Sequence, residues 1–141
     1  MILLDTNVVS EAMARKPTRS VVEWLNDQET ETLYLSTITI AEIGYGLACL
    51  PEGRRRRRLT DRFDQFLAIG FAHRVLAFDE EAARLYGELM GRRRTLGRPM
   101  SALDGQIAAI ARANRFGVAT RNVRDFEECD LEIVNPFEAK T

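Results

Sequence analysis

Short apolar runs alternate with longer amphipathic segments along the chain, and this alternation limits the folds that it can adopt. The runs are bounded as β-strands are; they lie at Ile2–Leu4, Leu33–Leu35, Val75–Phe78, Val118–Thr120 and, more weakly, Leu131–Val134. Strands that are separated by helices favour a parallel sheet with helices on both faces. We therefore predict an α/β fold with three layers, α/β/α, around a central and mainly parallel sheet.

The segments between these runs carry apolar residues at helical spacing. Ile40, Ile43, Gly44 and Leu47 follow the i, i+3, i+4, i+7 pattern of one helix face. Similar patterns predict further helices; they centre on Trp24, on Phe63 and Phe66, on Ala82 to Met90, and on Leu103 to Ala111.

The length of the chain and its hydrophobic content suit one domain. With 141 residues and 45% hydrophobic residues, the chain can bury one core, so we predict a single domain over residues 1–141. A membrane span needs about 18 consecutive apolar residues, and no run comes near that length. The apolar N-terminal run stops at Asp5, too soon for a signal peptide. These features predict a cytoplasmic protein. Cys49 and Cys129 have no CxxC spacing, so we expect inert thiols.

Acidic and amide side chains recur where strands end and helices begin. Asp5 ends the first strand, and Glu42 and Asp104 are expected in the first turns of two later helices. Asn122 and Asp125 follow the fourth strand. In a parallel α/β fold, strand carboxyl ends and helix N-termini share one edge of the sheet, where ligands bind. We therefore expect all five side chains at this edge.

Each acid also has a simpler structural interpretation. The segments Thr39–Glu42 and Ser101–Asp104 both have the spacing of a capping box, in which the acid satisfies a helix N-terminus. Asp5 could cap a helix as well, although Thr6 and Asn7 are equally well placed for that role. Taken singly, none of these acids indicates a function.

Taken together, the acids pose an electrostatic problem. Carboxylates within about 5 Å of one another repel, and their pKa values rise unless a cation lies between them. Carboxylate oxygens favour Mg²⁺ or Mn²⁺ over zinc, and His73 is expected to be a surface or packing residue. Such an ion can activate water and stabilise charge on a phosphate. The predicted reaction is hydrolysis of a phosphodiester bond by water. Of the five side chains, Asp125 also has a simpler interpretation, because it could start a turn.

Arginine dominates the positive charge of a chain whose net charge is only -1. Lysine occurs only at Lys16 and Lys140, and the arginines cluster at Arg54–Arg58 and Arg92–Arg94. Each cluster suits either a solvated helix face or a surface that contacts nucleic acid or a protein partner. The sequence leaves these alternatives open.

Four motifs in the same order as in a known family support the same chemistry. They are MILLDTN at the start, Thr39–Glu42, Ala102–Ala109, and Ala119–Asn122 followed by Asp125-Phe126. Together they resemble the motifs of PIN-domain nucleases and, more narrowly, of the VapC/FitB toxins of bacterial type II toxin-antitoxin modules. The resemblance extends over essentially the whole chain.

The resemblance implies roles for particular residues. Asp5, Glu42 and Asp104 match the family's acidic metal site, and Thr6 and Asn7 match the polar neighbours of its first motif. The last motif adds the supporting hydroxyl of Thr120 and two further catalytic candidates, Asn122 and Asp125. Members commonly have an aspartate where this chain has Asn122, so the site has one carboxylate fewer unless Asp125 compensates. That difference weakens the case for a tightly bound second metal ion.

The resemblance also implies a biological role. It predicts an Mg²⁺-dependent ribonuclease toxin, with Mn²⁺ as a possible substitute, that forms a homodimer or a higher assembly with its antitoxin. In the family the antitoxin covers the active site, often with an arginine that reaches the acids. The alternative from another class is a PIN-like scaffold that binds RNA or protein without cleaving it. Phosphatases of the haloacid-dehalogenase type and response-regulator receivers need a lysine near a strand end, and the positions of Lys16 and Lys140 disfavour both.

Overall fold

The computed structural model describes residues 1–138, and residues 139–141, which include Lys140, lie outside the described part. Five strands form one sheet in the order β3-β2-β1-β4-β5, and every neighbouring pair is parallel. The strands are β1 (Ile2–Leu4), β2 (Leu33–Ser36), β3 (Val75–Leu76), β4 (Gly117–Ala119) and β5 (Ile133–Val134). The predicted parallel sheet is confirmed, although β3 ends at Leu76 rather than Phe78 and β4 ends one residue before Thr120.

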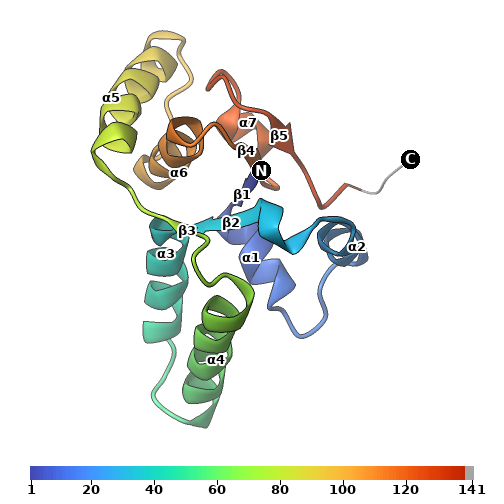
Figure 1. Ribbon diagram of the computed structural model, residues 1–141. Coiled ribbons are helices and arrows are strands. Elements are labelled where there is room, and N and C mark those ends of the chain that lie inside the picture. The colour runs from blue at the N-terminus through green and yellow to red at the C-terminus, as the bar shows by residue number, and fades with distance from the viewer. Residues whose placement is uncertain (139–141) are drawn as a thin grey trace.

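Helices fill the segments between the strands (Figure 1). They are α1 (Thr6–Ala12), α2 (Arg19–Asp27), α3 (Thr37–Ala48), α4 (Arg54–Gln65), α5 (Glu80–Thr95), α6 (Ala102–Ala113) and α7 (Val123–Phe126), with a 3₁₀ turn at Thr30–Thr32 and a π turn at Phe66–Gly70. Within the described residues, no helix is both long enough and apolar enough to cross a membrane.

The core consists of two apolar clusters, one on each face of the sheet. Leu3 and Val118 face a cluster with residues of α5, α6 and α7, whereas Leu4 and Ala119 face a cluster with residues of α1, α2 and α4. Neighbouring residues of a strand point to opposite faces, so helices cover both. The three-layer α/β/α architecture is confirmed.

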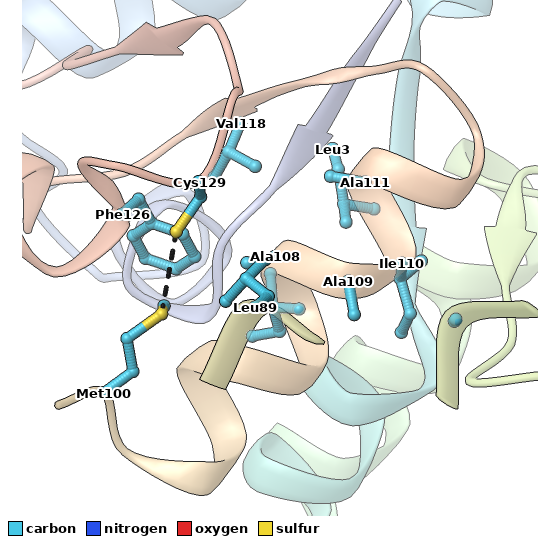
Figure 2. Packing of buried hydrophobic residues seen from close by; sticks show 12 residues of the cluster. Leu3, Leu89, Met100, Ala108, Ala109, Ile110, Ala111, Val118, Phe126 and Cys129 are labelled. Carbon is cyan, nitrogen blue, oxygen red and sulfur yellow. Dashed lines mark hydrogen bonds between the residues drawn. The ribbon is translucent and has the colours of Figure 1, made fainter. Parts of the chain in front are cut away.

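Sulfur and aromatic side chains complete the first of these clusters. Figure 2 shows Phe126 and Cys129 against Val118, with Cys129 Sγ 3.6 Å from the sulfur of Met100. Burial raises the pKa of the Cys129 thiol, which keeps it protonated and unreactive. Cys129 therefore packs as a small apolar residue.

The arginine cluster at the end of α5 has a structural role. Arg93 is only 3% exposed, and its guanidinium donates to the carbonyl oxygen of Arg98 at 2.6 Å and to that of Glu127. Arg92 pairs with Asp130 at 3.0 Å. For Arg93, both interpretations of the cluster as an exposed surface are wrong, because this side chain ties α5 to the loop before α6 and to the end of α7.

We expect Arg93→Met to destabilise the protein by about 2 kcal/mol, because the buried carbonyl oxygens would lose their donor while the alkyl stem stays in place. Urea denaturation measures the change. Arg94→Met is the matched control, since Arg94 is an exposed neighbour on the same helix, and it should shift the free energy of unfolding by less than about 0.5 kcal/mol. Equal effects of the two substitutions would contradict the anchoring role of Arg93.

The second cluster is mostly exposed. Arg54–Arg58 form the first turns of α4, and all but the half-buried Arg56 are exposed. Figure 1 places the start of α4 at the end of α3 that is remote from the sheet. This cluster therefore lies away from the strand ends, and both interpretations of it stay open.

Candidate active site

Polar side chains at the carboxyl ends of β1, β2 and β4 line one pocket of about 450 Å³, a size typical of ligand sites. The described residues that line it are Asp5, Thr6, Asn7, Ser10, Glu11, Glu42, Asp104, Arg121 and Asn122. The fold thus brings together residues that the sequence separates by more than a hundred positions. Two predicted site residues do not line this pocket. Thr120 is buried and donates a hydrogen bond to Asp5, and Asp125 lines a neighbouring pocket.

Asp5 lies at the base of the pocket and is 4% exposed. Its Oδ1 accepts a hydrogen bond from the Thr6 backbone N–H at 2.8 Å. Its Oδ2 accepts from the Thr120 hydroxyl at 2.8 Å and from the Asn7 amide at 3.2 Å. Asp5 is also the N-cap of α1, which begins at Thr6. The expectation that Thr6 or Asn7 would serve equally well as the cap is therefore wrong.

The environment of Asp5 disfavours its ionised form. Burial raises its pKa to about 6, against the hydrogen bonds from Thr120 and Thr6, and the charges of Asp104 and Glu42 add to the rise. Both charged groups that shift this pKa are therefore acids. A bound cation would favour the ionised form and relieve the repulsion.

Glu42 enters the pocket from α3, but from a different turn than expected. Ser36 caps α3 by accepting from the Thr39 N–H at 3.1 Å, so the helix begins at Thr37 and Glu42 lies in its second turn. The predicted first-turn position and the capping box at Thr39–Glu42 are both wrong. Ser36 takes the cap because β2 ends there.

A chain of hydroxyl groups orients the Glu42 carboxylate. Thr6 Oγ1 donates to Glu42 Oε1 at 2.8 Å, and it lies 3.0 Å from the hydroxyl of the buried Thr39. Because Thr6 starts α1 and Thr39 lies in α3, these hydrogen-bonded hydroxyl groups join the two helices at the pocket. Thr6 therefore supports the site by holding Glu42.

Asp104 enters from the first turn of α6, as predicted. Ser101 caps this helix and accepts from the Asp104 N–H at 3.2 Å. Burial raises the pKa of Asp104, and the charge of Asp125 adds to the rise. The next residue, Gly105, has no side chain to separate the helices: a Cβ there would lie 2.4 Å from the sulfur of Met90 in α5. Close packing of α5 on α6 thus helps to place Asp104.

The last motif divides between the pocket and its surroundings. The Asn122 N–H donates to Thr120 Oγ1 at 3.0 Å, and its exposed side chain lines the pocket. Asp125 lines a neighbouring pocket, which also includes Asn122. Asp125 thus influences Asp104 through its charge and is not among the residues that line the acidic pocket.

Three lining residues were absent from the sequence-based prediction. Ser10 and Glu11 lie on α1, and Arg121 follows β4. Because α1 begins at Thr6, Asn7 shares one helix face with Ser10 and Glu11, which are three and four residues further on. Knowing the start of α1 would have identified these two. No spacing in the sequence singles out Arg121.

The donor atoms of the pocket fit a hard divalent cation in kind. The residues that line the pocket offer carboxylate, hydroxyl and amide oxygens, which are the ligands that Mg²⁺ takes in proteins. Within residues 1–138, no three His, Cys, Asp or Glu side chains are gathered as tightly as the ligands of one ion. Three like charges repel, so the carboxylates would have to draw together around a cation.

Comparison with known proteins identifies the fold and the motifs. The family model of the PIN domain matches residues 2–131. The chain belongs to the PIN domain family. This PIN domain is 46% identical to the VapC ribonuclease Y4jK of Sinorhizobium fredii, over 98% of this chain and 99% of that protein. It is 41% identical to Toxin FitB of Neisseria gonorrhoeae, over 97% and 99% of the two chains.

A solved structure extends the likeness to three dimensions. The crystal structure of FitAcB from Neisseria gonorrhoeae contains a chain that is 40% identical to this PIN domain. It matches with a TM-score of 0.92 and covers 99% of this chain and 100% of that one. The resemblance inferred from the four sequence motifs is therefore confirmed.

Proposed function

We propose that this PIN domain is an Mg²⁺-dependent endoribonuclease that hydrolyses RNA phosphodiester bonds and acts as the toxin of a type II toxin-antitoxin module. The observation that carries the proposal is the pocket of about 450 Å³ that Asp5, Glu42 and Asp104 line together, where the charges of Asp104 and Glu42 help to raise the pKa of Asp5. The relatives named VapC ribonuclease and Toxin FitB support the same activity and role.

In this proposal, Asp5, Glu42 and Asp104 hold the ion. Bound Mg²⁺ would stabilise negative charge on the phosphate and make water a better nucleophile. Thr6 orients Glu42, and Thr120 keeps a proton directed at Asp5 Oδ2, so that this carboxylate is fixed before substrate arrives. No side-chain nucleophile is required, because water attacks the phosphorus.

The amide of Asn122 limits the charge of the site. It offers an oxygen to the pocket without adding a negative charge, and Asp125 lies in the neighbouring pocket. We therefore propose that one ion binds tightly, and that Mn²⁺ can replace Mg²⁺. A second ion would have too few carboxylates for tight binding.

We also propose a protein partner and a cellular location. A toxin that degrades RNA in the cytoplasm needs an inhibitor, and an acidic pocket suits an antitoxin that brings an arginine to the carboxylates. The family resemblance supports an antitoxin complex built on a toxin homodimer. Binding of the antitoxin would then exclude both RNA and water from the pocket.

An RNA assay with toxin freed of antitoxin tests the function. We expect it to fragment a structured RNA such as bulk tRNA in Mg²⁺ or Mn²⁺ and to leave it intact in EDTA, because the carboxylates alone cannot stabilise the phosphate charge. Gel electrophoresis of the products measures the rate. Binding of RNA without fragmentation in either metal would favour the alternative, a PIN-like scaffold that does not cleave. The observation that favours this alternative is Asn122, which stands where family members commonly have an aspartate.

A further inference from the structure

Arg121 is the basic residue among the described residues that line the acidic pocket. It follows the end of β4 and is exposed. Its backbone N–H donates to Asn7 Oδ1 at 3.2 Å, and Asn7 in turn donates to Asp5. The Asn7 side chain thus binds both the backbone of Arg121 at the rim of the pocket and the carboxylate of Asp5.

An aromatic ring holds the guanidinium of Arg121. Its Cζ lies 4.0 Å from the centroid of the Phe137 ring, a distance at which the cation–π attraction is favourable. The backbone of Phe137 is fixed, because its N–H donates to Asn135 Oδ1 at 3.0 Å and its carbonyl oxygen accepts from the Ser20 hydroxyl at 3.0 Å. Its half-buried side chain packs against the second apolar cluster. Phe137 therefore provides a fixed platform for the guanidinium.

Within residues 1–138, the N–H groups of this guanidinium have no partner and are available to a ligand. Across the described residues, no ion pair and no side-chain hydrogen bond involves the Arg121 guanidinium. Glu11, the acid of the pocket whose pKa it influences, accepts instead from the backbone and the hydroxyl of Thr18 at 2.7 and 2.6 Å. A guanidinium that rests on a ring keeps its donors available at its edge, and this fork matches two phosphate oxygens.

The negative charge of the pocket favours a guanidinium at its rim when RNA binds. Four acids line the pocket, Asp5, Glu11, Glu42 and Asp104, and one divalent cation compensates only two of their negative charges when all are ionised. A phosphodiester would bring a further negative charge to the pocket. Arg121 supplies the positive charge at the rim. Among the described residues it makes no ion pair with Asp5, Glu42 or Asp104, so their oxygens stay available to the metal ion.

We propose that Arg121 binds a phosphodiester group of the RNA strand at the rim of the pocket, and that Phe137 is the positioning residue that holds its guanidinium for this contact. The inference rests on the proposed ribonuclease function and adds a substrate-binding residue to it. Arg121 thereby aligns the strand over the three carboxylates.

RNA binding in EDTA tests this proposal without relying on cleavage. The probe is a short fluorescein-labelled single-stranded RNA, and its anisotropy is followed over a series of KCl concentrations. Each phosphate contact contributes about 0.7 to the slope of log K against log salt for single strands. We expect Arg121→Gln to lower the slope by about that amount and to weaken binding about tenfold at low salt, whereas Arg121→Lys should keep the slope and bind with intermediate affinity.

Arg115 provides the matched control. It is exposed like Arg121 but precedes β4, at the opposite edge of the sheet, where it lines a different pocket. Arg115→Gln removes the same charge and should leave the slope unchanged. Equal slopes for the two Gln variants would overturn the proposal, because they would reduce Arg121 to a part of the general surface charge.

Substitutions of Phe137 separate positioning from folding. Phe137→Leu should weaken RNA binding as Arg121→Gln does. Phe137→Tyr, which keeps the ring, should bind RNA with wild-type affinity. If Arg121 serves only to anchor Phe137, then Arg121→Gln lowers the melting temperature and leaves RNA affinity and slope unchanged, which would overturn the proposal. A wild-type protein that binds RNA through Arg121 but never cleaves it in Mg²⁺ would instead refute the ribonuclease function alone.

Discussion

Asp5→Asn is expected to slow RNA cleavage in Mg²⁺ by about a hundred- to a thousandfold. Stabilisation of the phosphate charge by a bound metal ion is worth several kcal/mol, and each 1.36 kcal/mol changes a rate tenfold. Asp5 is the most buried of the three carboxylates in the pocket, and removal of its charge weakens the hold on the ion most directly. Initial rates on bulk tRNA measure the effect.

The same variant should remain folded. Asparagine has the shape of aspartate, and its carbonyl oxygen can still accept the hydrogen bond from the Thr6 N–H that caps α1. Its amide nitrogen cannot replace Oδ2 as the acceptor for Thr120 and Asn7. The variant also lacks the carboxylate whose ionised form burial disfavours, the effect that raises the pKa of Asp5 to about 6. In EDTA at pH 8 the two effects oppose each other, and we expect a melting temperature close to that of the wild type.

Asp125→Asn is the control for this experiment. Asp125 is an exposed acid beside the pocket, and its substitution should change the rate less than tenfold. Equal cleavage by the wild type and Asp5→Asn would contradict the role of Asp5 and would indicate a contaminating nuclease.

The second large effect is on stability as a function of pH. The folded state raises the pKa of Asp5 from 3.8 to about 6, so between these values the folded chain binds more protons than the unfolded chain. The titration of Asp5 should therefore remove about 3 kcal/mol of stability from the metal-free protein as the pH rises from about 4 to 6, and higher pH should not return it. Asp104, whose pKa is also raised, acts in the same direction. Glu11, Glu127 and Asp130, whose pKa values are lowered, act in the opposite direction.

Mg²⁺ should restore much of this stability above pH 7. A ligand at a hundred times its Kd stabilises the folded state by about 2.7 kcal/mol, and protons compete with the ion below about pH 5. Thermal melts at pH 5 and pH 8, each in EDTA and in Mg²⁺, measure the coupling. Asp5→Asn should show a smaller decline with pH, because Asp104 still contributes, and it should lose most of the gain with metal. A wild type that behaves like this variant would contradict the proposed site.

The sequence predicted the layers and the strands because hydrophobic periodicity reflects burial directly. Leu3 and Leu4 point to opposite clusters, and a strand with both sides buried produces the apolar run that marks it. Strand and helix ends were predicted less well. Ser36 and Thr39 both have an acceptor at the right spacing to cap α3, and the choice depends on β2 extending to Ser36, which pairs with Leu76 of β3.

Charged residues were the least predictable from sequence. Arg93 and Arg94 are adjacent arginines of one helix, yet the first is buried against backbone carbonyls and the second is exposed. Only the packing of α5 against the residues around α7 distinguishes them. Arg121 follows β4 and Phe137 follows β5, and the two side chains are in contact. No local sequence pattern predicts this contact.

Anomalous diffraction from crystals soaked in Mn²⁺ at pH 8 tests most directly whether three distant acids share one hard cation. The proposed site predicts one strong peak in the pocket, within coordination distance of carboxylate oxygens from Asp5, Glu42 and Asp104, and no such peak in Asp5→Asn crystals. A saturated crystal with no peak between these side chains, or with Mn²⁺ bound elsewhere while they point apart, would contradict it.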